Sequence, residues 1–390
     1  MKNVTSTFTS NTRPLKRLVF TVTNDLVYDQ RMIRICGSLA SSGYGVTLVG
    51  AGHRSSPPLL IAPFTQRRLN TWFRKGPAFY AEYNFRLFFF LLFSKADLFC
   101  CIDLDTIIPV WMAGVIKRRL RVYDAHEYFP QQKEIITRKF IYRTWHWIER
   151  KFVPRFPNGY TVGNEIAATF RRFYQVDYIV IRNMPLLRPS PVFPTGADRF
   201  ILYQGALNEA RGLEYLVPAM KHVDAKLFLY GDGNFKEQTK LCIAINNLGD
   251  KVFVKGKLLP SELERITSRA YIGANLVENI GLNQYYSLAN KFFDYIHHLV
   301  PQVTMDYPEY RTINEQFEVA LLLKDLEPAT ISNALNRLLN DEVLYRRLRE
   351  NCLLARQQLN WQQEEKKLLD FYNRVFSMHH DRKALTYRHS

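Results

Sequence analysis

The chain is poor in features that define several other classes of protein. Its five cysteines are scattered and form no CxxC pair, so neither a disulfide framework nor a cysteine zinc site is expected. Its most hydrophobic run, LFFFLLF at 87–93, is far shorter than the ~20 residues of a membrane-spanning helix. The N-terminal stretch has no apolar signal core. We therefore expect a cytoplasmic protein, soluble or peripheral on the inner membrane, with residues 87–93 in a buried helix.

Acidic residues are scarce relative to basic ones. There are 36 Asp and Glu against 53 Lys and Arg, a formal net charge of +17. This surplus favours anionic partners: nucleic acid, phosphorylated small molecules or an acidic membrane face. Basic residues are dense between Lys117 and Arg172, and this region is either a contact for a phosphate-rich surface or a solvated face of helices. The sequence carries no Ser–His–Asp, nucleophile-elbow or metal-ligand pattern.

Apolar runs typical of strands alternate with stretches typical of helices. RLVFTV (17–22) and GVTLVG (45–50) are early examples, and the pattern restarts at RFILYQG (199–205) after a proline-rich segment. Such alternation predicts an α/β fold with two parallel sheets, each covered by helices, in two Rossmann-like domains. The predicted parts are a first domain at 16–184, a linker at 185–198, a second domain at 199–360, and a C-terminal helix at 361–378 that packs back on the first domain.

Glycine-rich turns follow two strands of the predicted second domain, at the sheet edge where ligands bind in such folds. Gly205 ends one strand, and Arg211 stands just before a helix. A helix N-terminus and a guanidinium together suit a phosphate, although a solvated surface Arg is the alternative. Gly231, in LYGDGN, is explained equally well by a tight turn and by a nearby ligand.

The segment NQYYSLANKFFDY (283–295) places polar side chains among aromatic rings. A helix that begins near residue 289 puts Asn290 and Asp294 one turn apart on the same face. Its N–H groups would attract a diphosphate, and Asp294 can accept hydrogen bonds from two ribose hydroxyls. Lys291 adds a cation. The alternative is an ordinary surface ion pair between Lys291 and Asp294.

Two acidic or imidazole-bearing segments follow strands of the predicted first domain. His126 and Glu127 stand in YDAHEYFP, and Asp103 and Asp105 stand in CIDLDT. At strand ends these side chains are candidates to face a ligand. The alternatives are a structural His–Glu pair and, for Asp105, a helix cap.

Taken together, these segments resemble the retaining nucleotide-sugar glycosyltransferases of family 4, which have the GT-B architecture. The resemblance runs from about residue 19 to residue 376. The matching pieces, in the family's order, are YDQRMIRICGSLASSGYGVTLVG, ADLFCCIDLDTIIPVWMAG, RVYDAHEYFP, TVGNEIAATF, VIRNMP, YQGALNEARGLEYLVPAM, LYGDG, VKGKLLPSEL and NQYYSLANKFFDYI.

The resemblance implies a central cleft between the two domains, with the donor held by the second and the acceptor by the first. Arg211 matches the residue that neutralises the donor diphosphate, and Asp294 stands where the family has an acid at the ribose. His126 matches a residue that faces the reaction centre. Glu278 resembles the acid near the donor sugar, although the fifteen residues between it and Asp294 are more than the family has.

This chain departs from the family at several positions. Ala206 stands where many relatives carry a second phosphate-binding Arg, so Lys257 or Lys291 is expected to compensate. The other departures are Ala289 in place of Pro, Gln302 in a usually apolar strand, and Cys101 where His is frequent.

The implied activity is hexosyl transfer from a nucleotide diphosphate sugar to a glycan or lipid-linked acceptor, with retention, in surface polysaccharide or glycoconjugate synthesis. No metal or cofactor and no nucleic-acid partner are expected. The alternatives are a nucleotide-sugar epimerase, a phosphorylase, a non-catalytic glycan or membrane scaffold on the same fold, and a nucleic-acid binder with steep salt dependence. The expected site consists of catalytic His126, Arg211 and Glu278, donor-binding Gly205, Gly231, Lys257, Asn290, Lys291 and Asp294, and acceptor-side Asp103, Asp105 and Glu127.

Overall fold

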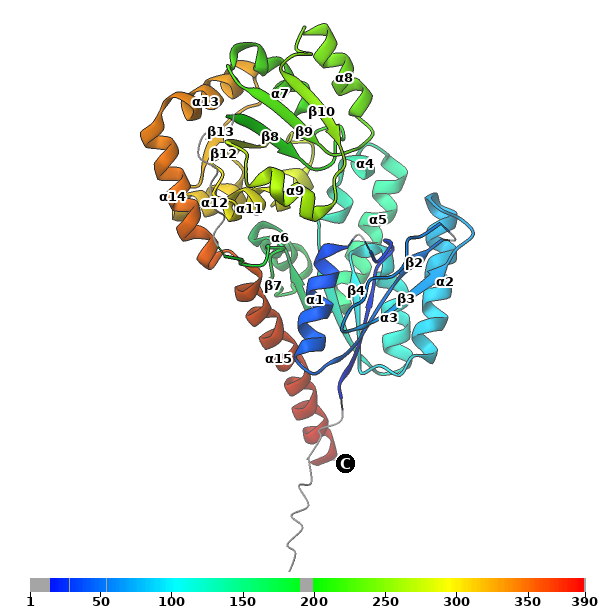
Figure 1. Cartoon of the computed structure of the whole chain (residues 1–390). Helices are drawn as coiled ribbons and strands as arrows, with labels where there is room; N and C mark the ends of the chain where they lie inside the picture. The colour runs from blue at the N-terminus through cyan, green and yellow to red at the C-terminus, as the bar shows by residue number, and fades with distance from the viewer. Residues whose placement is uncertain (1–14, 28, 54, 190–198, 389–390) are drawn as a thin grey trace, which may run out of the picture. The chain divides into compact units, whose positions relative to one another are not determined.

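The structure is a computed structural model, described here for residues 15–27, 29–53, 55–189 and 199–388. Within this part of the chain, two compact units are distinguished. The first contains residues up to 125 together with 148–159 and the chain from 368 onward, and the second contains 126–147 and 160–367. Figure 1 shows a sheet flanked by helices in each half of the chain. Residues 190–198 of the predicted linker lie outside the described residues.

The first sheet is parallel, with its seven strands in the order β3-β2-β1-β4-β5-β6-β7. Its strands are β1 (Arg17–Thr21), β2 (Gly45–Gly52), β3 (Thr65–Asn70), β4 (Leu98–Ile102), β5 (Leu120–Ala125), β6 (Asn158–Thr161) and β7 (Ile179–Val180). The helices in this part of the sequence are α1 (Gln30–Ser41), α2 (Gly76–Phe93), α3 (Ile107–Ile116), α4 (Lys133–Ile136), α5 (Lys139–Phe152) and α6 (Asn164–Tyr174).

Burial and capping account for these elements. The inner strand β4 reads LFCCI and is buried throughout, as expected of a parallel strand covered on both faces. Helix α1 begins after Asp29, whose carboxylate accepts a hydrogen bond from the N–H of Met32, and the turn after it contains Gly43 at φ +90°. Strand β3 reads TQRRLN at the sheet edge, and the sequence patterns above do not predict it because it lacks an apolar run.

The second sheet is also parallel, with six strands in the order β10-β9-β8-β11-β12-β13. Its strands are β8 (Phe200–Gln204), β9 (Lys226–Tyr230), β10 (Val252–Gly256), β11 (Ile272–Asn275), β12 (Gln302–Met305) and β13 (Ala320–Leu323). The helices are α7 (Leu213–Ala219), α8 (Lys236–Ile245), α9 (Pro260–Thr267), α10 (Leu282–Tyr285), α11 (Asn290–His297), α12 (Pro308–Phe317), α13 (Pro328–Asn340), α14 (Glu342–Gln358) and α15 (Trp361–Arg388). The predicted α/β fold with two parallel sheets is confirmed.

Two buried polar side chains of the second unit, Gln302 and His297, make hydrogen bonds to backbone carbonyls. Gln302, which interrupts an otherwise apolar strand, is fully buried and donates from its amide to the carbonyl of Phe292 at 3.0 Å. The Nε2 of buried His297 lies 2.7 Å from the carbonyl oxygen of Leu359. Burial of a polar group costs little when it is hydrogen-bonded, so both residues are compatible with a close-packed core.

Helix α2 differs from the buried helix that the run at 87–93 predicts. Tyr83, Leu87 and Leu91 are fully buried, whereas Phe89 and Phe93 are 42% and 83% exposed. Only one face of α2 is therefore used by the core of the first unit. Figure 1 shows α2 and α3 on the same side of the first sheet, with α1 on the other side. This matches right-handed crossovers, because the chain passes from β3 to β4 and from β4 to β5 in the same direction.

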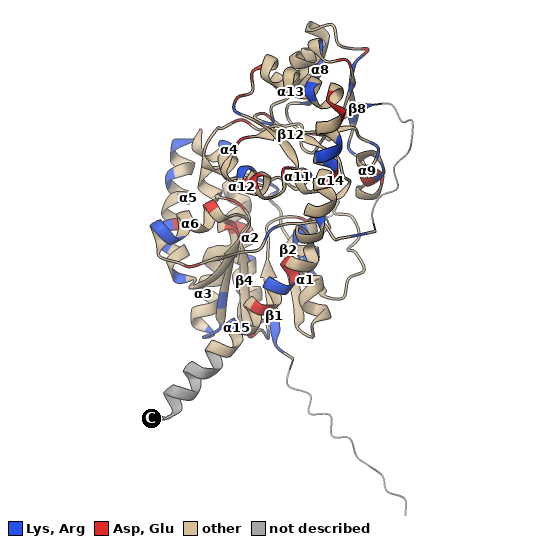
Figure 2. Cartoon of the chain, turned by 90° about the vertical axis from the view of Figure 1, so that its left-hand side faces the viewer, with Lys and Arg blue, Asp and Glu red and all other residues tan. Residues whose placement is uncertain are grey.

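Basic residues are not confined to one region. Lys and Arg lie on α5 and α6, within the predicted basic region at 117–172, and also on α14 (Figure 2). Charge alone therefore does not single out one surface of this chain.

Candidate functional site

The candidate site lies at the carboxyl ends of β8 and β11, two neighbouring strands of the second sheet. From β8 the chain continues through α7 to β9 on one side, and from β11 through α11 to β12 on the other. The two connections diverge at this point, and doubly wound sheets bind their ligands where the connections diverge. Gly205 and Arg211 follow β8, and Glu278 and the segment 290–294 follow β11. The sheet order thus brings together the residues predicted for the donor.

The glycine turns after β8 and β9 are in direct contact. Gly205 has φ +129° and Gly231 has φ +156°, and a Cβ added at Gly231 would lie 1.8 Å from the carbonyl oxygen of Gly205. The N–H of Gly205 donates to the carbonyl of Tyr230, and the N–H of Gly231 donates to that of Gly256. Gly205 is therefore favoured by its backbone conformation, and Gly231 by both its conformation and the close approach of the other turn. Of the alternatives raised by the sequence, the tight turn explains these glycines without a ligand.

Lys291 lies at the first turn of α11 and points toward the turn after β8. Its Nζ is 3.6 Å from the centre of the Tyr203 ring and 3.6 Å from the place of a Cβ on Gly205. Burial lowers the pKa of Lys291 well below its usual range, the nearby Arg211 lowers it further, and Asp294 opposes them. The ring face of Tyr203 also favours the charged form. An anion bound at this turn would favour the charged form strongly.

Asp294 is held by a short relay of side chains. The amide of Gln204, at the end of β8, donates to the carboxylate of Asp294 at 2.9 Å. The hydroxyl of Thr267 donates in turn to the amide oxygen of Gln204 at 2.7 Å. Gln204 and Thr267 are 4% and 1% exposed, so this relay is fixed in the core while Asp294 is half-buried. Asp294 is thus positioned by the protein, and Gln204 and Thr267 are site-supporting residues that sequence reasoning missed.

Arg211 is exposed and lies in a strained turn. Ala210 before it has φ +63° and Gly212 after it has φ +71°. The N–H of Glu278 donates to the carbonyl of Ala210 at 3.0 Å, which ties the loop after β11 to this turn. Burial raises the pKa of Glu278, and the nearby Glu214 raises it further. Glu278 is therefore placed beside the Arg211 turn.

The long segment between Glu278 and Asp294 includes the short helix α10, which contacts residues 127–131. The side-chain oxygen of Asn283 accepts a hydrogen bond from the N–H of Tyr128 at 2.9 Å, and its amide donates to Glu127 at 3.3 Å. A Cβ on Gly281 would lie 2.8 Å from the carbonyl oxygen of Gln131. Asn283 was not predicted as a site residue, although the unusual length of the segment was a signal that it carries extra structure.

The remaining predicted residues lie as follows. Lys257 is exposed just after β10, and Asn290 is exposed at the start of α11, where its side-chain oxygen accepts from Asn183 at 2.9 Å. His126, directly after β5, is half-buried, and Glu127 is exposed. In the first unit, Asp103 has φ +52° before the short 3₁₀ turn at 104–106, and Asp105 accepts a hydrogen bond from the hydroxyl of Thr23. Asp105 lies inside this 3₁₀ turn and not at a cap position: Asp103 precedes the turn without a side-chain capping bond, and Thr106 precedes α3.

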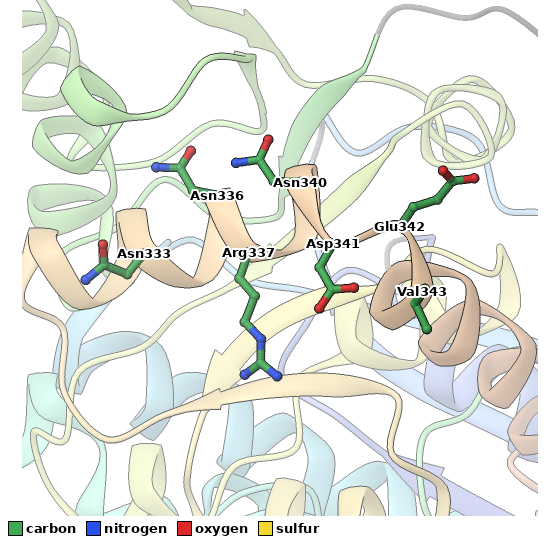
Figure 3. A pocket seen from close by; sticks show the side chains of 7 residues that line it. All are labelled: Asn333, Asn336, Arg337, Asn340, Asp341, Glu342 and Val343. Atoms are coloured by element: carbon green, nitrogen blue, oxygen red, sulfur yellow. The ribbon is translucent and has the colours of Figure 1, made fainter.

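A surface hollow at the junction of α13 and α14 contains none of the predicted site residues. Figure 3 shows Asn336 and Asn340 on one side of the α13 ribbon and Arg337 on the other. The residues that line the hollow are Asn333, Asn336, Arg337, Asn340, Asp341, Glu342 and Val343. Among the described residues, no group of three or more His, Cys, Asp or Glu side chains is arranged to hold a metal ion.

The part of the chain that holds the candidate donor site matches a known protein family. Residues 190–353, which include every predicted donor residue, match the family model described as glycosyl transferases group 1. No curated protein sequence matches the chain.

Several solved structures share the fold at low sequence identity. Sucrose-phosphate synthase from Thermosynechococcus elongatus gives a TM-score of 0.78 at 16% identity over 93% of this chain and 100% of that chain. HepE from Anabaena, in complex with UDP-glucose, gives 0.71 at 11% identity over 92% and 99%. WaaG, a glycosyltransferase involved in lipopolysaccharide biosynthesis, gives 0.69 at 13% identity over 90% and 98%. The chain therefore has the GT-B fold.

Proposed function

We propose that this chain is a glycosyltransferase that moves a hexose from a nucleoside diphosphate sugar to a glycan or lipid-linked acceptor, with retention at the anomeric carbon. The observation that carries the proposal is the arrangement around the ends of β8 and β11. There, Lys291 lies against the glycine turn, Arg211 lies near Lys291, and Asp294 is fixed by Gln204. The match of residues 190–353 to glycosyl transferases group 1 supports it, as does the UDP-glucose bound to HepE.

Each group has a chemical role in this proposal. The departing diphosphate gains negative charge as the sugar leaves, and Arg211 with Lys291 stabilises that charge without a metal ion. Asp294 accepts hydrogen bonds from the ribose hydroxyls, which fixes the position of the donor. The acceptor oxygen attacks on the face that the diphosphate leaves, so the configuration is kept. The acceptor proton passes to the leaving phosphate oxygen, so no strong protein base is needed.

His126 and Glu127 are proposed to face the acceptor side of the reaction. Both belong to the segment that Asn283 ties to the loop between Glu278 and Asp294 through its bonds to Tyr128 and Glu127. This attachment supports a role for the segment beside the donor residues of the second unit. Asp103 and Asp105, in the first unit, are proposed to bind acceptor hydroxyls.

A thermal-shift panel of UDP, GDP, ADP and their sugars tests the proposal. A ligand that binds only the folded state raises the melting temperature in a saturable way, so one of these nucleotides should do so at ordinary salt. Binding should persist in EDTA. If no nucleoside diphosphate stabilises the chain and RNA or DNA binds with a steep salt dependence instead, the donor assignment is wrong.

A second measurement separates an enzyme from a binding scaffold on the same fold. The donor identified in the panel is incubated with the protein, and release of the nucleoside diphosphate is followed with and without candidate acceptors. We expect slow hydrolysis that an acceptor accelerates. Saturable binding with no turnover under any of these conditions would instead support a non-catalytic scaffold.

A further inference from the structure

Helix α2 carries apolar side chains on two opposite faces. Tyr83, Leu87 and Leu91 face the core and are fully buried. Two positions along, Phe85 and Phe93 are 66% and 83% exposed, with Phe89 between them in the same four-residue repeat. An offset of two residues is about 200° of helical rotation, so these rings point away from the sheet. Because the core covers only one apolar face of α2, the opposite apolar face is expected to contact another apolar surface.

Helix α3 continues this exposed apolar surface. It exposes Met112, Val115 and Ile116, and it lies beside α2 on the same side of the sheet (Figure 1). The two helices are tied at their C-terminal ends, because the ammonium of Lys117 donates to the carbonyls of Leu91 and Leu92, at 3.3 and 2.7 Å. We name the exposed residues Phe85, Phe89, Phe93, Met112, Val115 and Ile116 the α2–α3 face.

The charges around the α2–α3 face are mostly positive. Helices α2 and α3 contain one acidic residue, Glu82. Its carboxylate accepts hydrogen bonds from Arg86 and from the N–H of Trp72. Lys95 and Arg118 are exposed just beyond the C-terminal ends of α2 and α3. The face therefore combines aromatic rings with the cations Lys95 and Arg118, which we call its rim. The one acid on α2 and α3, Glu82, is already paired with Arg86.

We propose that the α2–α3 face docks the first unit on an anionic lipid surface, with α2 lying parallel to the membrane plane. Rings and aliphatic side chains would enter the boundary between headgroups and acyl chains, and the rim cations would contact lipid phosphates. Within the described residues, no helix is long and apolar enough to cross a membrane. Docking on the surface is the membrane contact that these helices fit.

A second copy of the chain is a poorer occupant of the same face. A two-fold dimer through these helices would bring two positively charged surfaces together, and the one acid on α2 and α3, Glu82, is already paired with Arg86. Like charges that meet across an interface are unfavourable, whereas an anionic lipid surface complements them. The inference rests on the proposed function and deepens it, because a chain docked on lipid would meet a lipid-linked acceptor at that surface, but its measurement does not depend on sugar transfer.

Vesicle co-sedimentation of the full chain tests the proposal. Wild-type protein should partition onto phosphatidylglycerol–phosphatidylcholine vesicles more strongly than onto phosphatidylcholine alone. The variant F85Q/F89Q/F93Q should lower this partitioning at least about tenfold, since it removes the inserting rings. Gln is a good helix former, and all three positions are exposed, so α2 should still fold. The variant K95Q/R118Q should lower the preference for anionic lipid and weaken its dependence on salt.

A matched control uses L241Q/I245Q on α8 of the second unit, where two apolar residues are 60% and 70% exposed at one-turn spacing. This pair should leave vesicle binding unchanged. The proposal is overturned if wild type stays in the supernatant, or if F85Q/F89Q/F93Q sediments like wild type. It is also overturned if that variant changes only the oligomeric state, which would identify a second copy as the occupant.

The same samples distinguish this proposal from the proposed function. F85Q/F89Q/F93Q should keep the thermal shift given by the nucleoside diphosphate, because the donor residues lie in the second unit. Loss of vesicle binding with an intact nucleotide response supports the docking surface. If the protein binds vesicles but responds to no nucleotide, the docking surface is supported and the donor assignment is rejected.

Discussion

The two sheets have related topology but use their strand ends differently. At the ends of β1 and β4 in the first unit, polar side chains bind one another: Thr21 bonds to Thr106 at 2.9 Å, and Thr23 donates to Asp105. At the ends of β8 and β11 in the second unit, the amine of Lys291 lies against the glycine turn at Gly205, and Arg211 is near enough to lower the pKa of Lys291. The polar groups named in the first unit bond to one another, whereas the second unit gathers two basic side chains at its strand ends.

This difference favours the second unit as the place of the proposed donor site. A diphosphate requires cations and backbone N–H groups that are held in place before it arrives. The second unit supplies two basic side chains, Arg211 and Lys291, and the match to glycosyl transferases group 1 falls at residues 190–353, within the same part of the chain. Changes in the first unit's buried polar pairs should therefore alter stability, whereas changes at the second unit's strand ends should alter ligand binding and turnover.

The largest expected effect is on stability, in the first unit. Arg31 and Asp124 form a buried ion pair at 3.0 Å, with side chains 5% and 0% exposed. Asp124→Asn leaves the guanidinium without its charge partner and should lower the free energy of unfolding by about 3–5 kcal/mol. Urea unfolding measures this.

The double variant Arg31→Met/Asp124→Leu provides the control for that prediction. It removes both charges, so it should lose less stability than Asp124→Asn. Equal losses in the two variants would show that packing, rather than an uncompensated charge, dominates at this site. Nucleotide binding should persist in each variant at temperatures where it remains folded.

Arg211→Ala should produce the largest effect on turnover. Removal of one group that stabilises developing charge typically costs about 100- to 1000-fold in kcat. Arg211 is exposed, so unfolding should change little. Arg346→Ala on α14, which removes an exposed Arg paired with Glu342, is the matched control and should leave turnover unchanged. Transfer and donor hydrolysis at wild-type rates in Arg211→Ala would contradict the assigned role.

His297 gives the second unit a stability term that depends on pH. Burial lowers its pKa from 6.5 to about 4. The unfolded chain therefore binds a proton more readily than the folded one, so this contribution is complete above pH 6.5 and is lost as pH falls toward 4. Between pH 7.5 and pH 5 the loss should be about 2 kcal/mol. Urea unfolding of wild type and His297→Gln at both pH values isolates this term, which should be missing from the variant.

The smallest effect should come from the relay that holds Asp294. Thr267→Val removes the hydroxyl that donates to Gln204, so Gln204 holds Asp294 less firmly, and nucleotide affinity should fall by about tenfold, or ~1.4 kcal/mol. Thr239→Val on α8 is the control, because Thr239 is equally buried and its hydroxyl bonds to the carbonyl of Phe235. Equal nucleotide affinity in the two variants would show that the relay does not support the ribose site.

Much of the fold is predictable from the sequence because its inner strands are continuous apolar runs. RLVFTV and RFILYQG correspond to β1 and β8, and the expected helix near 289 is α11. Strand β3 was missed because an edge strand does not need an apolar pattern. The buried helix expected at 87–93 was partly wrong because a run of apolar residues does not reveal how many of its faces the core covers.

The candidate site is predictable only in part for a similar reason. Sequence reasoning places Gly205 and Arg211 after a strand and Lys291 in a helix that begins near residue 289, and the fold then brings them together. Spacing does not reveal that Thr267, from α9, reaches Gln204, because that contact depends on how a distant helix packs. Nor does it reveal that Asn283 bonds to Tyr128, 155 residues earlier in the chain.

The contact between Gly205 and Gly231 limits how this protein can be altered. A methyl group on Gly231 would lie 1.8 Å from the carbonyl oxygen of Gly205, and Gly205 itself has φ +129°, so a larger residue is disfavoured at the first position by contact and at the second by backbone conformation. A designer who wants a different nucleotide preference must leave both glycines in place and vary their exposed neighbours instead. Ala206, exposed beside the first turn, is the natural starting position for such a library.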